Sequence, residues 1–471
     1  MILNKLERLD AKIDQITVPS ASQPPAPIPG REPDSSQQLA DPKVKPISFS
    51  AHLMIEWPAV RELLPQSVVV PNGNYALQLE EERPNLPISQ QRSYPEGFLA
   101  DLSVSTVREL SDAYFATFNL MTPVLDRKLY FHRTLGAAIN GGFGYDADSC
   151  VVLMTMALGC WGSQTLSESH RTSPLYHPSP LSDRSHHTPS EQSTRDLPGL
   201  AFYNEARKRI GFLECEHSMQ ICQFYLLAAT YLGQLLRPVD CWSMTMRAGT
   251  CCLKFWETSN EGDEWTKDMF SRLFWITVMF ETVFTQELTD LPASKIRDME
   301  DRVPLPKFVQ FKHSFTTTDA DDDESFYHYH FLSQIAHRIF LTRVYSSSYY
   351  CTPTGDYPNM SLTRELYHQL DQWRSQLPPA LRFDDDSPDP DPEVLTNVLV
   401  VSWLRARYSV ARYHLGRPFL YKALHHPYAL TEHDRHRCKQ TLESILRWAA
   451  IMRNISNVKS CIPLAFLMCG Q

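Results

Sequence analysis

The sequence predicts an all-α fold, and three observations lead to that prediction. Several segments of the 471-residue chain repeat apolar residues at the period of an amphipathic helix. Alternating apolar and polar residues bounded by turn pairs, the pattern of a half-buried strand, are hard to find. Glycine is scarce, at 17 residues, whereas nucleotide-binding folds depend on tight glycine turns. We therefore expect a large helical bundle, preceded by a short coiled coil and a disordered linker.

Residues 1–16 are expected to form a coiled-coil dimerisation helix. Their apolar residues alternate between spacings of four and three, which is the a/d rhythm of a coiled coil over about two heptads. Lys5 and Asp10 fall at g and e positions, where opposite charges attract across a parallel dimer. A helix lying on the protein's own surface is the alternative for so short a repeat. The expected dimer seam consists of Ile2, Leu6, Leu9, Ile13 and Ile16.

Two polar regions follow. Residues 17–46 carry eight prolines among Ser, Gln, Ala and charged residues, a composition that buries too little apolar surface to fold. We expect a disordered linker there. Residues 47–97 are expected to contain an entry helix that is interrupted at Pro58, and then a polar loop.

Residues 98–471 are expected to form one all-α domain. Residues 218–235 and 269–284 are apolar nearly all round, which in a soluble protein is typical of helices at the centre of a bundle. Two polar stretches interrupt the helical pattern, and we expect a disordered insertion at 162–198 and a loop at 383–393. Further helices are expected from the apolar spacing at 104–118 and at 362–377.

Charge and composition exclude several classes of protein. The chain has 45 Lys and Arg residues against 54 Asp and Glu residues, a net charge of -9, so its bulk surface is a poor candidate for binding DNA phosphates. No N-terminal signal peptide is recognisable, and we expect no membrane span. Without a secretory signal, the eleven cysteines are expected to be reduced thiols.

The sequence contains no motif of catalysis or cofactor binding whose flanking secondary structure fits that function. Gly142, Gly144 and Ala147 match the G-x-G-x-x-A spacing, but a helical segment precedes them where a dinucleotide site needs a strand, so we expect a helix-joining turn. We find no nucleophile elbow, no P-loop and no paired C-x-x-C knuckles. We expect no enzymatic activity, no bound cofactor and no metal site in this chain.

Two groups of histidines are candidates for metal binding, although neither has the spacing of a known zinc motif. We expect surface histidines on helices instead. A helical enzyme or ligand carrier that uses the region of His330 and His337 is the weakest of the alternatives. The two groups are His328, His330 and His337, and then His433, His436 and Cys438.

Loose motifs in a fixed order run through most of the chain. The most diagnostic block lies at 273–292, where a Phe-Trp pair starts a helix and a proline follows the acidic positions. The residues that carry the pattern are Trp57, Pro58, Phe274, Trp275, Glu281, Glu287, Pro292, Trp373, Arg417 and Pro418. In this order they resemble the regulatory middle homology region of fungal Zn2Cys6, or binuclear zinc cluster, transcription factors.

The resemblance implies an all-α fungal transcription factor regulatory domain that follows a DNA-binding zinc cluster and a dimerising coiled coil. Members of that family regulate transcription in the nucleus, in some cases in response to a small-molecule effector. We therefore expect a nuclear, pathway-specific regulator, for example of a metabolic or secondary-metabolite gene cluster. Its expected partner is a second copy or a related regulator, and its chemistry is binding.

The chain departs from the family pattern at its N-terminus. The six-cysteine cluster that holds two zinc ions and binds DNA in this family does not occur in these 471 residues. One expectation is that the coding region continues upstream of Met1, so that DNA is bound through that cluster. The alternative is a cluster-less interaction protein that heterodimerises with intact regulators and dampens them. At Gln471 the chain also stops where relatives continue into further helices.

Overall fold

The computed structural model describes residues 45–50, 52–68, 75–87, 97–172, 197–259, 262–288, 291–312, 324–385, 395–455 and 460. Helices dominate these residues, which confirms the all-α prediction. The strands of the described part are the two-residue β1 (Lys45–Pro46) and β2 (Tyr350–Cys351), which pair antiparallel. The predicted coiled coil at 1–16, with Ile2, Leu6, Leu9, Ile13 and Ile16, and residues 17–44 of the linker lie outside the described residues.

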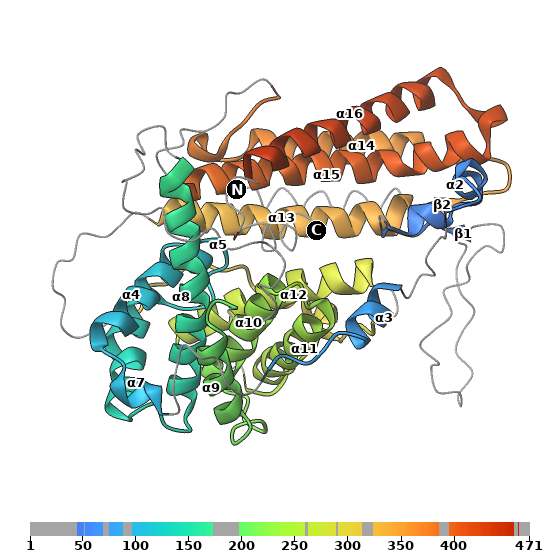
Figure 1. Cartoon of the computed structure of the whole chain (residues 1–471). Helices are drawn as coiled ribbons and strands as arrows, with labels where there is room; N and C mark the ends of the chain where they lie inside the picture. Colours follow the sequence, from blue (N-terminus) through green and yellow to red (C-terminus); the bar gives the residue numbers. More distant parts are fainter. Residues whose placement is uncertain are drawn as a thin grey trace, which may run out of the picture.

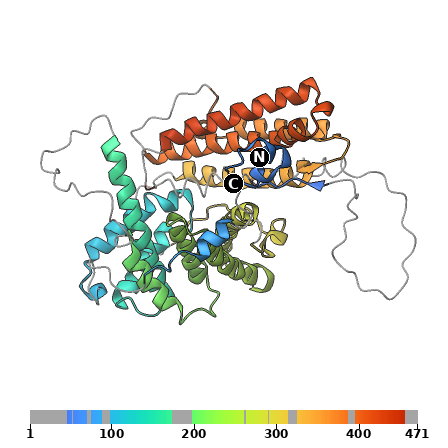
Figure 2. The same ribbon diagram turned by 45° about the vertical axis from the view of Figure 1, so that its right-hand side comes forward.

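The long helices form a lower body and an upper layer (Figures 1 and 2). In the lower body α4 packs on α8, α8 on α9 and α10, α10 on α11, and α11 on α12. These helices are α4 (Val104–Phe115), α8 (Ala147–Thr172), α9 (Leu200–Ile210), α10 (Met219–Gln234), α11 (Pro238–Lys254) and α12 (Glu264–Glu287).

The upper layer is built on α13 (Ser325–Ser348), which runs between the lower body and the other three helices (Figures 1 and 2). Helix α13 contacts α5 and α12 below it and α14 and α15 above it, and α15 packs along α16. The other three helices are α14 (Met360–Ser375), α15 (Leu395–His425) and α16 (Glu432–Ile455).

Short elements connect the long helices. Among them, α2 begins at Pro58, whose fixed φ and missing N–H suit the first position of a helix. The short elements are η1 (His52–Glu56), α2 (Pro58–Leu63), α3 (Tyr75–Glu81), η2 (Phe98–Asp101), α5 (Phe118–Met121), α6 (Arg127–Leu129), η3 (Tyr130–Thr134), α7 (Leu135–Asn140), η4 (Phe255–Ser259), η5 (Ile296–Met299), η6 (Pro379–Leu381) and η7 (Pro427–Ala429).

Side-chain caps fix where the central helices begin. The Ser218 hydroxyl accepts the backbone N–H of Ile221 at the start of α10, and the Asp263 carboxylate accepts that of Thr266 at the start of α12. Nearly every residue in the middle of both helices is buried, which confirms the sequence prediction for 218–235 and 269–284. The predicted turn at Gly142 is also confirmed, because Gly142 has a φ of 63° between α7 and α8.

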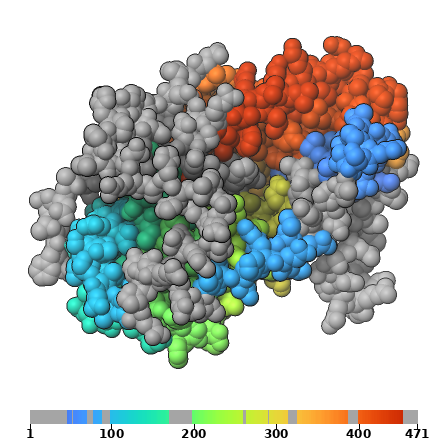
Figure 3. All heavy atoms as spheres, viewed as in Figure 1, coloured from blue at the N-terminus to red at the C-terminus, as the bar shows by residue number. Residues whose placement is uncertain are grey.

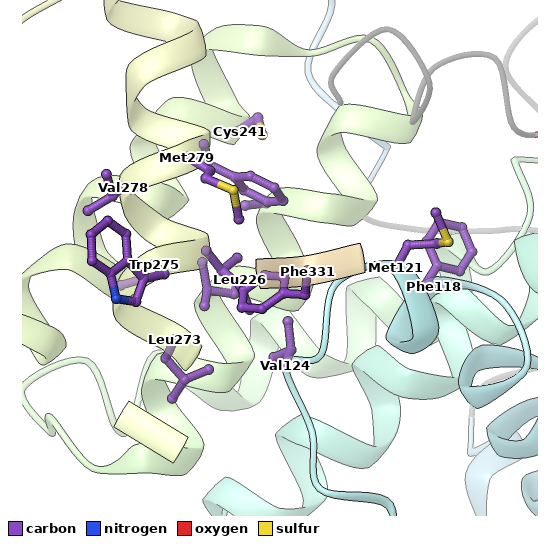
Figure 4. Packing of buried hydrophobic residues seen from close by; sticks show 14 of the residues in the cluster. Phe118, Met121, Val124, Leu226, Cys241, Leu273, Trp275, Val278, Met279 and Phe331 are labelled. Carbon is purple, nitrogen blue, oxygen red and sulfur yellow. The ribbon is translucent and has the colours of Figure 1, made fainter. Parts of the chain in front are cut away.

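The core is continuous across the boundary between the two layers. Phe331 of α13 is fully buried and lies beside Leu226 of α10 and Val124 of the loop after α5 (Figure 4). Trp275 and Met279 of α12 belong to the same cluster. Helix α13 is therefore joined to the lower body by apolar packing along its first half.

Helix α8 is longer than the sequence predicted. It continues to Thr172, so the first part of the insertion expected at 162–198 is helical. The reason is tertiary packing: Thr165 is buried, and its hydroxyl lies 2.9 Å from that of Ser460. A stretch of the same helix, Ala147–Glu168, is long and apolar enough to cross a membrane, although no span was expected. Most of this stretch is buried inside the protein, as in the core helix of a folded domain.

Candidate functional site: a clamp on the N-terminal arm

The chain enters the domain along one end of the upper layer. We call residues 45–50 and 52–57 the N-terminal arm. Figure 3 shows the blue residues of this region lying against the orange-red helices of the upper layer. Strand β1 anchors the start of the arm on β2, and the backbone N–H of Ile47 donates to the carbonyl of Tyr349 at 2.9 Å.

Arg417 of α15 holds the arm through its backbone. Its guanidinium donates to three successive carbonyls, those of Ser48 at 3.2 Å, of Ser50 at 2.9 Å, and of Phe49. The side chain is fully buried. Since a buried charge needs hydrogen-bond partners, the arm's carbonyls are what makes this position tolerable for an arginine.

Aromatic rings surround the guanidinium of Arg417. Its central carbon lies 5.8 Å from the ring centroids of Trp57 and Tyr349 and 5.6 Å from that of Tyr413. Such cation–π contacts strengthen when water is excluded. Trp57 also packs edge-on against Tyr421 of α15, with the centroids 4.9 Å apart. The signature residues Trp57 and Arg417, which lie far apart in the sequence, therefore meet in one site.

A histidine of α15 also packs against the arm. Phe49 stacks on His414 of α15, with the ring centroids 4.0 Å apart and the planes within 8°. The Tyr349 hydroxyl lies 2.9 Å from the carbonyl oxygen of His414 and 3.0 Å from its Nδ1. Burial, followed by the charge of Arg417, lowers the pKa of His414 well below its ordinary value. The imidazole is therefore neutral and acts as a flat packing surface.

The lower body contacts the arm through Glu287, near the end of α12. The Ser50 hydroxyl donates to Oε2 of Glu287 at 2.9 Å. Ser50 also offers its carbonyl to Arg417, so one residue of the arm is bonded to both layers. Pro58, exposed at the start of α2, and Pro418, buried next to Arg417 inside α15, complete this set of signature residues.

A second set of signature residues holds the segment after α12 and lies apart from the arm. Glu281 is fully buried and accepts the backbone N–H of Ser294 at 2.7 Å and its hydroxyl at 2.6 Å. Trp275 donates its indole N–H to the carbonyl of Pro304 at 3.2 Å, and Phe274 is buried beside it. The carbonyl of Pro292 accepts the indole N–H of Trp242 at 3.3 Å. These residues fix a loop on α12.

Trp373 belongs to neither set. It joins α14 to α13 by donating its indole N–H to the carbonyl of Ser333 at 3.1 Å. Its ring centroid lies 5.4 Å from that of His337. The ten signature residues therefore occupy three separate places, and the arm clamp is the one that connects distant parts of the chain.

Sequence reasoning missed two important groups. Phe49 and Ser50 lie in a stretch with no periodic pattern, and no signal in the sequence connects them to α15. Asp268 and Arg272 carry a readable signal, because they stand four residues apart on a helix. Asp268 Oδ2 lies 2.9 Å from Nε of Arg272, and the same carboxylate accepts backbone N–H groups from the segment at 307–309.

The expectation of surface histidines was wrong for His330 and His337, which are fully buried on α13. Burial lowers the pKa of His330 to about 3 and that of His337 well below its ordinary value. His337 lies 3.1 Å, through Nε2, from the carbonyl oxygen of Arg407 on α15. Among the described residues no group of three His, Cys, Asp or Glu side chains is placed to hold a metal ion. These histidines are neutral packing residues between α13 and α15.

One hollow lies at the end of α14. It has a volume of about 480 Å³, and its lining mixes acidic and basic side chains. Arg374 pairs there with Asp385 at 2.8 Å. The lining residues are His368, Asp371, Gln372, Arg374, Ser375, Arg382, Phe383 and Asp384.

Comparison with known proteins gives one match. The family model described as the fungal specific transcription factor domain matches residues 112–375, which is more than half of the chain. No curated protein and no solved structure matches. The family's members regulate transcription and are typically not enzymes. On the evidence of this match, the chain belongs to the fungal-specific transcription factor domain family.

Proposed function

We propose that this chain is the regulatory and dimerising part of a pathway-specific transcriptional regulator that works in the nucleus, and that the arm clamp is its control point. The observation that carries the proposal is the double attachment of the arm. Arg417 of α15 holds the arm's carbonyls, and Glu287 of α12 accepts the hydroxyl of Ser50. The arm leads back through residues 17–44 toward the predicted coiled coil, so the clamp joins the helical domain to whatever lies N-terminal to it.

The clamp gives a physical route for regulation. Because Ser50 is bonded to both layers, a shift of α12 relative to α15 cannot keep both bonds at their present lengths. Two arrangements, with the arm held and with the arm released, would then differ in the position and freedom of the N-terminal segment. A ligand or partner that favours one arrangement shifts the population toward it. The hollow at the end of α14 is the first place to test for a small-molecule effector.

The expected partners follow from the N-terminal pattern. Ile2, Leu6, Leu9, Ile13 and Ile16 would form the seam of a homodimer or of a heterodimer with a related regulator. DNA would be bound through a six-cysteine cluster carrying two zinc ions, N-terminal to the seam. Leu9→Asp places a charge in that seam and should reduce the sedimenting mass from dimer to monomer, whereas Arg8→Asp at an outward c position should not. Equal masses for parent and Leu9→Asp would remove the seam from the proposal.

A reporter assay tests the control point. The chain is fused behind a heterologous DNA-binding module, and transcription of a reporter gene is compared for the parent, Arg417→Gln and Arg435→Gln. Arg435 is the matched control because it lies on α16, exposed and paired only with Glu432. Releasing the arm should change reporter output about fivefold or more, the size of a typical allosteric coupling. Equal output from the parent and Arg417→Gln at equal protein level would contradict the proposal.

A further inference from the structure

Three thiols from two helices meet inside the lower body. Cys222 lies on α10, and Cys251 and Cys252 lie side by side in the sequence near the end of α11. The Sγ atoms of Cys222 and Cys252 are 3.7 Å apart, within hydrogen-bond distance for sulfur, and Cys251 is the chain neighbour of Cys252. All three side chains are at most 1% exposed. The sequence spacing of 30 residues gave no sign of this cluster.

The three thiols pack in the core, and two of them also have the properties of a redox-active pair. The neighbouring Cys222 thiol lowers the pKa of the Cys251 thiol, against the effect of burial, and the Lys254 ammonium adds to this. Burial raises the pKa of Cys222, which therefore keeps its proton. A thiol held closer to its thiolate form beside a protonated thiol is the arrangement in which one sulfur is oxidised and the other resolves it.

The position of the pair on α11 provides access. Cys251 and Cys252 lie in the last turn before Lys254, where α11 ends. The chain continues from there as the π-helical turn η4, Phe255–Ser259, whose wider hydrogen bonding is typical of functional irregularities. Local opening of such an irregular segment costs less free energy than global unfolding. A small oxidant can therefore reach Cys251 without unfolding of the domain.

We propose that Cys222, Cys251 and Cys252 form an oxidation site, at which a hydroperoxide produces a disulfide between α10 and α11. In the first step the Cys251 thiolate attacks one oxygen of the hydroperoxide, the O–O bond breaks, and a sulfenic acid forms. The expelled alkoxide or hydroxide takes a proton from solvent and leaves as an alcohol or water. In the second step the Cys222 sulfur attacks the sulfenic sulfur, its proton leaves with the hydroxyl as water, and the S–S bond forms. Direct oxidation of Cys252 followed by the same attack gives the second candidate product, Cys222–Cys252.

The geometry requires only a small movement. The Sγ atoms of Cys222 and Cys252 have to approach from 3.7 Å to about 2.05 Å, the length of a disulfide bond. Helices α10 and α11 already pack along each other, and the backbone link between the adjacent residues Cys251 and Cys252 disfavours a disulfide within that pair. Cys222 is therefore the shared partner in either product. The proposal is independent of the function proposed above, because it concerns thiol chemistry and not the arm.

The test uses the purified chain, hydrogen peroxide and mass spectrometry. After oxidation the remaining thiols are blocked with N-ethylmaleimide in denaturant, and the chain is cut with trypsin and an endoprotease specific for glutamate. Cleavage after Glu216 separates Cys215 from Cys222, because it leaves Cys222 on the peptide 217–247 and the vicinal pair on 248–254. Fragmentation then distinguishes Cys222 from Cys241, which lies on the same peptide.

The expected result is a cross-linked peptide pair with its bond at Cys222, formed in the parent and in Cys241→Ala and absent in Cys222→Ala. Cys241 is the matched control because it is equally buried on α11 but outside the cluster. In Cys222→Ala, oxidation at Cys251 should continue to the sulfinic acid, since no resolving thiol is left. The proposal is overturned if Cys222 stays blockable by N-ethylmaleimide in the parent after the exposed Cys215 has been fully oxidised.

Discussion

The middle of helix α12 buries mainly apolar side chains, whereas helices α13 and α15 bury several cationic and imidazole groups among their apolar residues. The middle of α12 carries Leu273, Phe274, Ile276, Val278 and Phe280, all nearly or fully inaccessible to water. The cationic and imidazole groups buried on α13 and α15, which we call the polar interface, are Arg338, Arg407, Arg417, His330, His337 and His414. The first region is held by non-directional packing and the second by directional hydrogen bonds.

The difference indicates that the apolar packing of α12 provides most of the stability, whereas the polar interface determines how the layers are arranged. A buried guanidinium gains little net free energy, because losing water costs about as much as its hydrogen bonds return. Arg338 illustrates this: burial lowers its pKa to about 9, and its hydrogen bonds go to neutral groups, to Gln286 at 3.3 Å and to Thr342 at 3.0 Å. The polar interface therefore favours one arrangement of the two layers but adds little net stability. A contact of this kind can be exchanged between two arrangements at low cost in free energy.

The largest expected effect is in the apolar region. Phe274→Ala removes a fully buried ring from α12 and should lower the free energy of unfolding by about 3 to 5 kcal/mol, measured by urea denaturation. Phe212→Ala is the control, because that ring is 75% exposed, and it should cost less than about 0.5 kcal/mol. Similar losses for the two variants would show that α12 is not the stabilising centre.

A smaller effect is expected at the clamp. Arg417→Met leaves three carbonyls of the arm without their charged donor, and should cost about 2 to 3 kcal/mol if the arm stays in place. If the arm is released instead, the global cost falls, and limited proteolysis should cut within 45–57 before the helices. An intact arm with unchanged stability in Arg417→Met, compared with Arg435→Met, would refute the clamp.

Acid should weaken the polar interface more than the apolar core. Burial lowers the pKa values of His330, His337 and His414 in the folded protein. For His330 the pKa is about 3 in the folded chain and near 6.5 in the unfolded chain. Between these two pH values the unfolded chain therefore binds more protons than the folded chain. Stability is then full above pH 6.5 and falls as the pH decreases, by about 1.4 kcal/mol per pH unit for each histidine. His330→Asn should reduce the slope of stability against pH by about one proton. A slope that His330→Asn does not alter would show that His330 is already protonated in the folded state.

The smallest effect belongs to a surface ion pair. Glu432 and Arg435 lie 3.1 Å apart on α16 with both side chains exposed, and Glu432→Gln should change stability by less than about 0.5 kcal/mol. The buried pair of Lys422 with Asp434, at 2.9 Å, gives the contrast, and Asp434→Asn should cost several times more. Equal costs in thermal unfolding would mean that burial does not set the strength of these pairs.

The sequence predicted the apolar helices α10 and α12, but it did not predict the buried polar contacts of α13 and α15. Continuous apolar stretches identify α10 and α12, because a helix that is apolar nearly all round is typical of the centre of a bundle. On α13, His330, His337 and Arg338 interrupt the pattern, so residues of the core look like residues of the surface. The contact between the arm and α15 could not be predicted either, because Ser50 and Arg417 are 367 residues apart and no local spacing links them. Tertiary packing extends α8 through residues whose composition is typical of a loop.

The clamp is tested most directly by hydrogen exchange of the arm. Amide exchange of residues 45–57 is followed by mass spectrometry in the parent, in Arg417→Gln and in the control Arg435→Gln. The clamp predicts slow exchange in the parent and in Arg435→Gln, and exchange faster by about tenfold or more in Arg417→Gln, with α10 and α12 unchanged. Equally slow exchange of the arm in all three proteins would show that Arg417 does not hold it, and would contradict the account of this site.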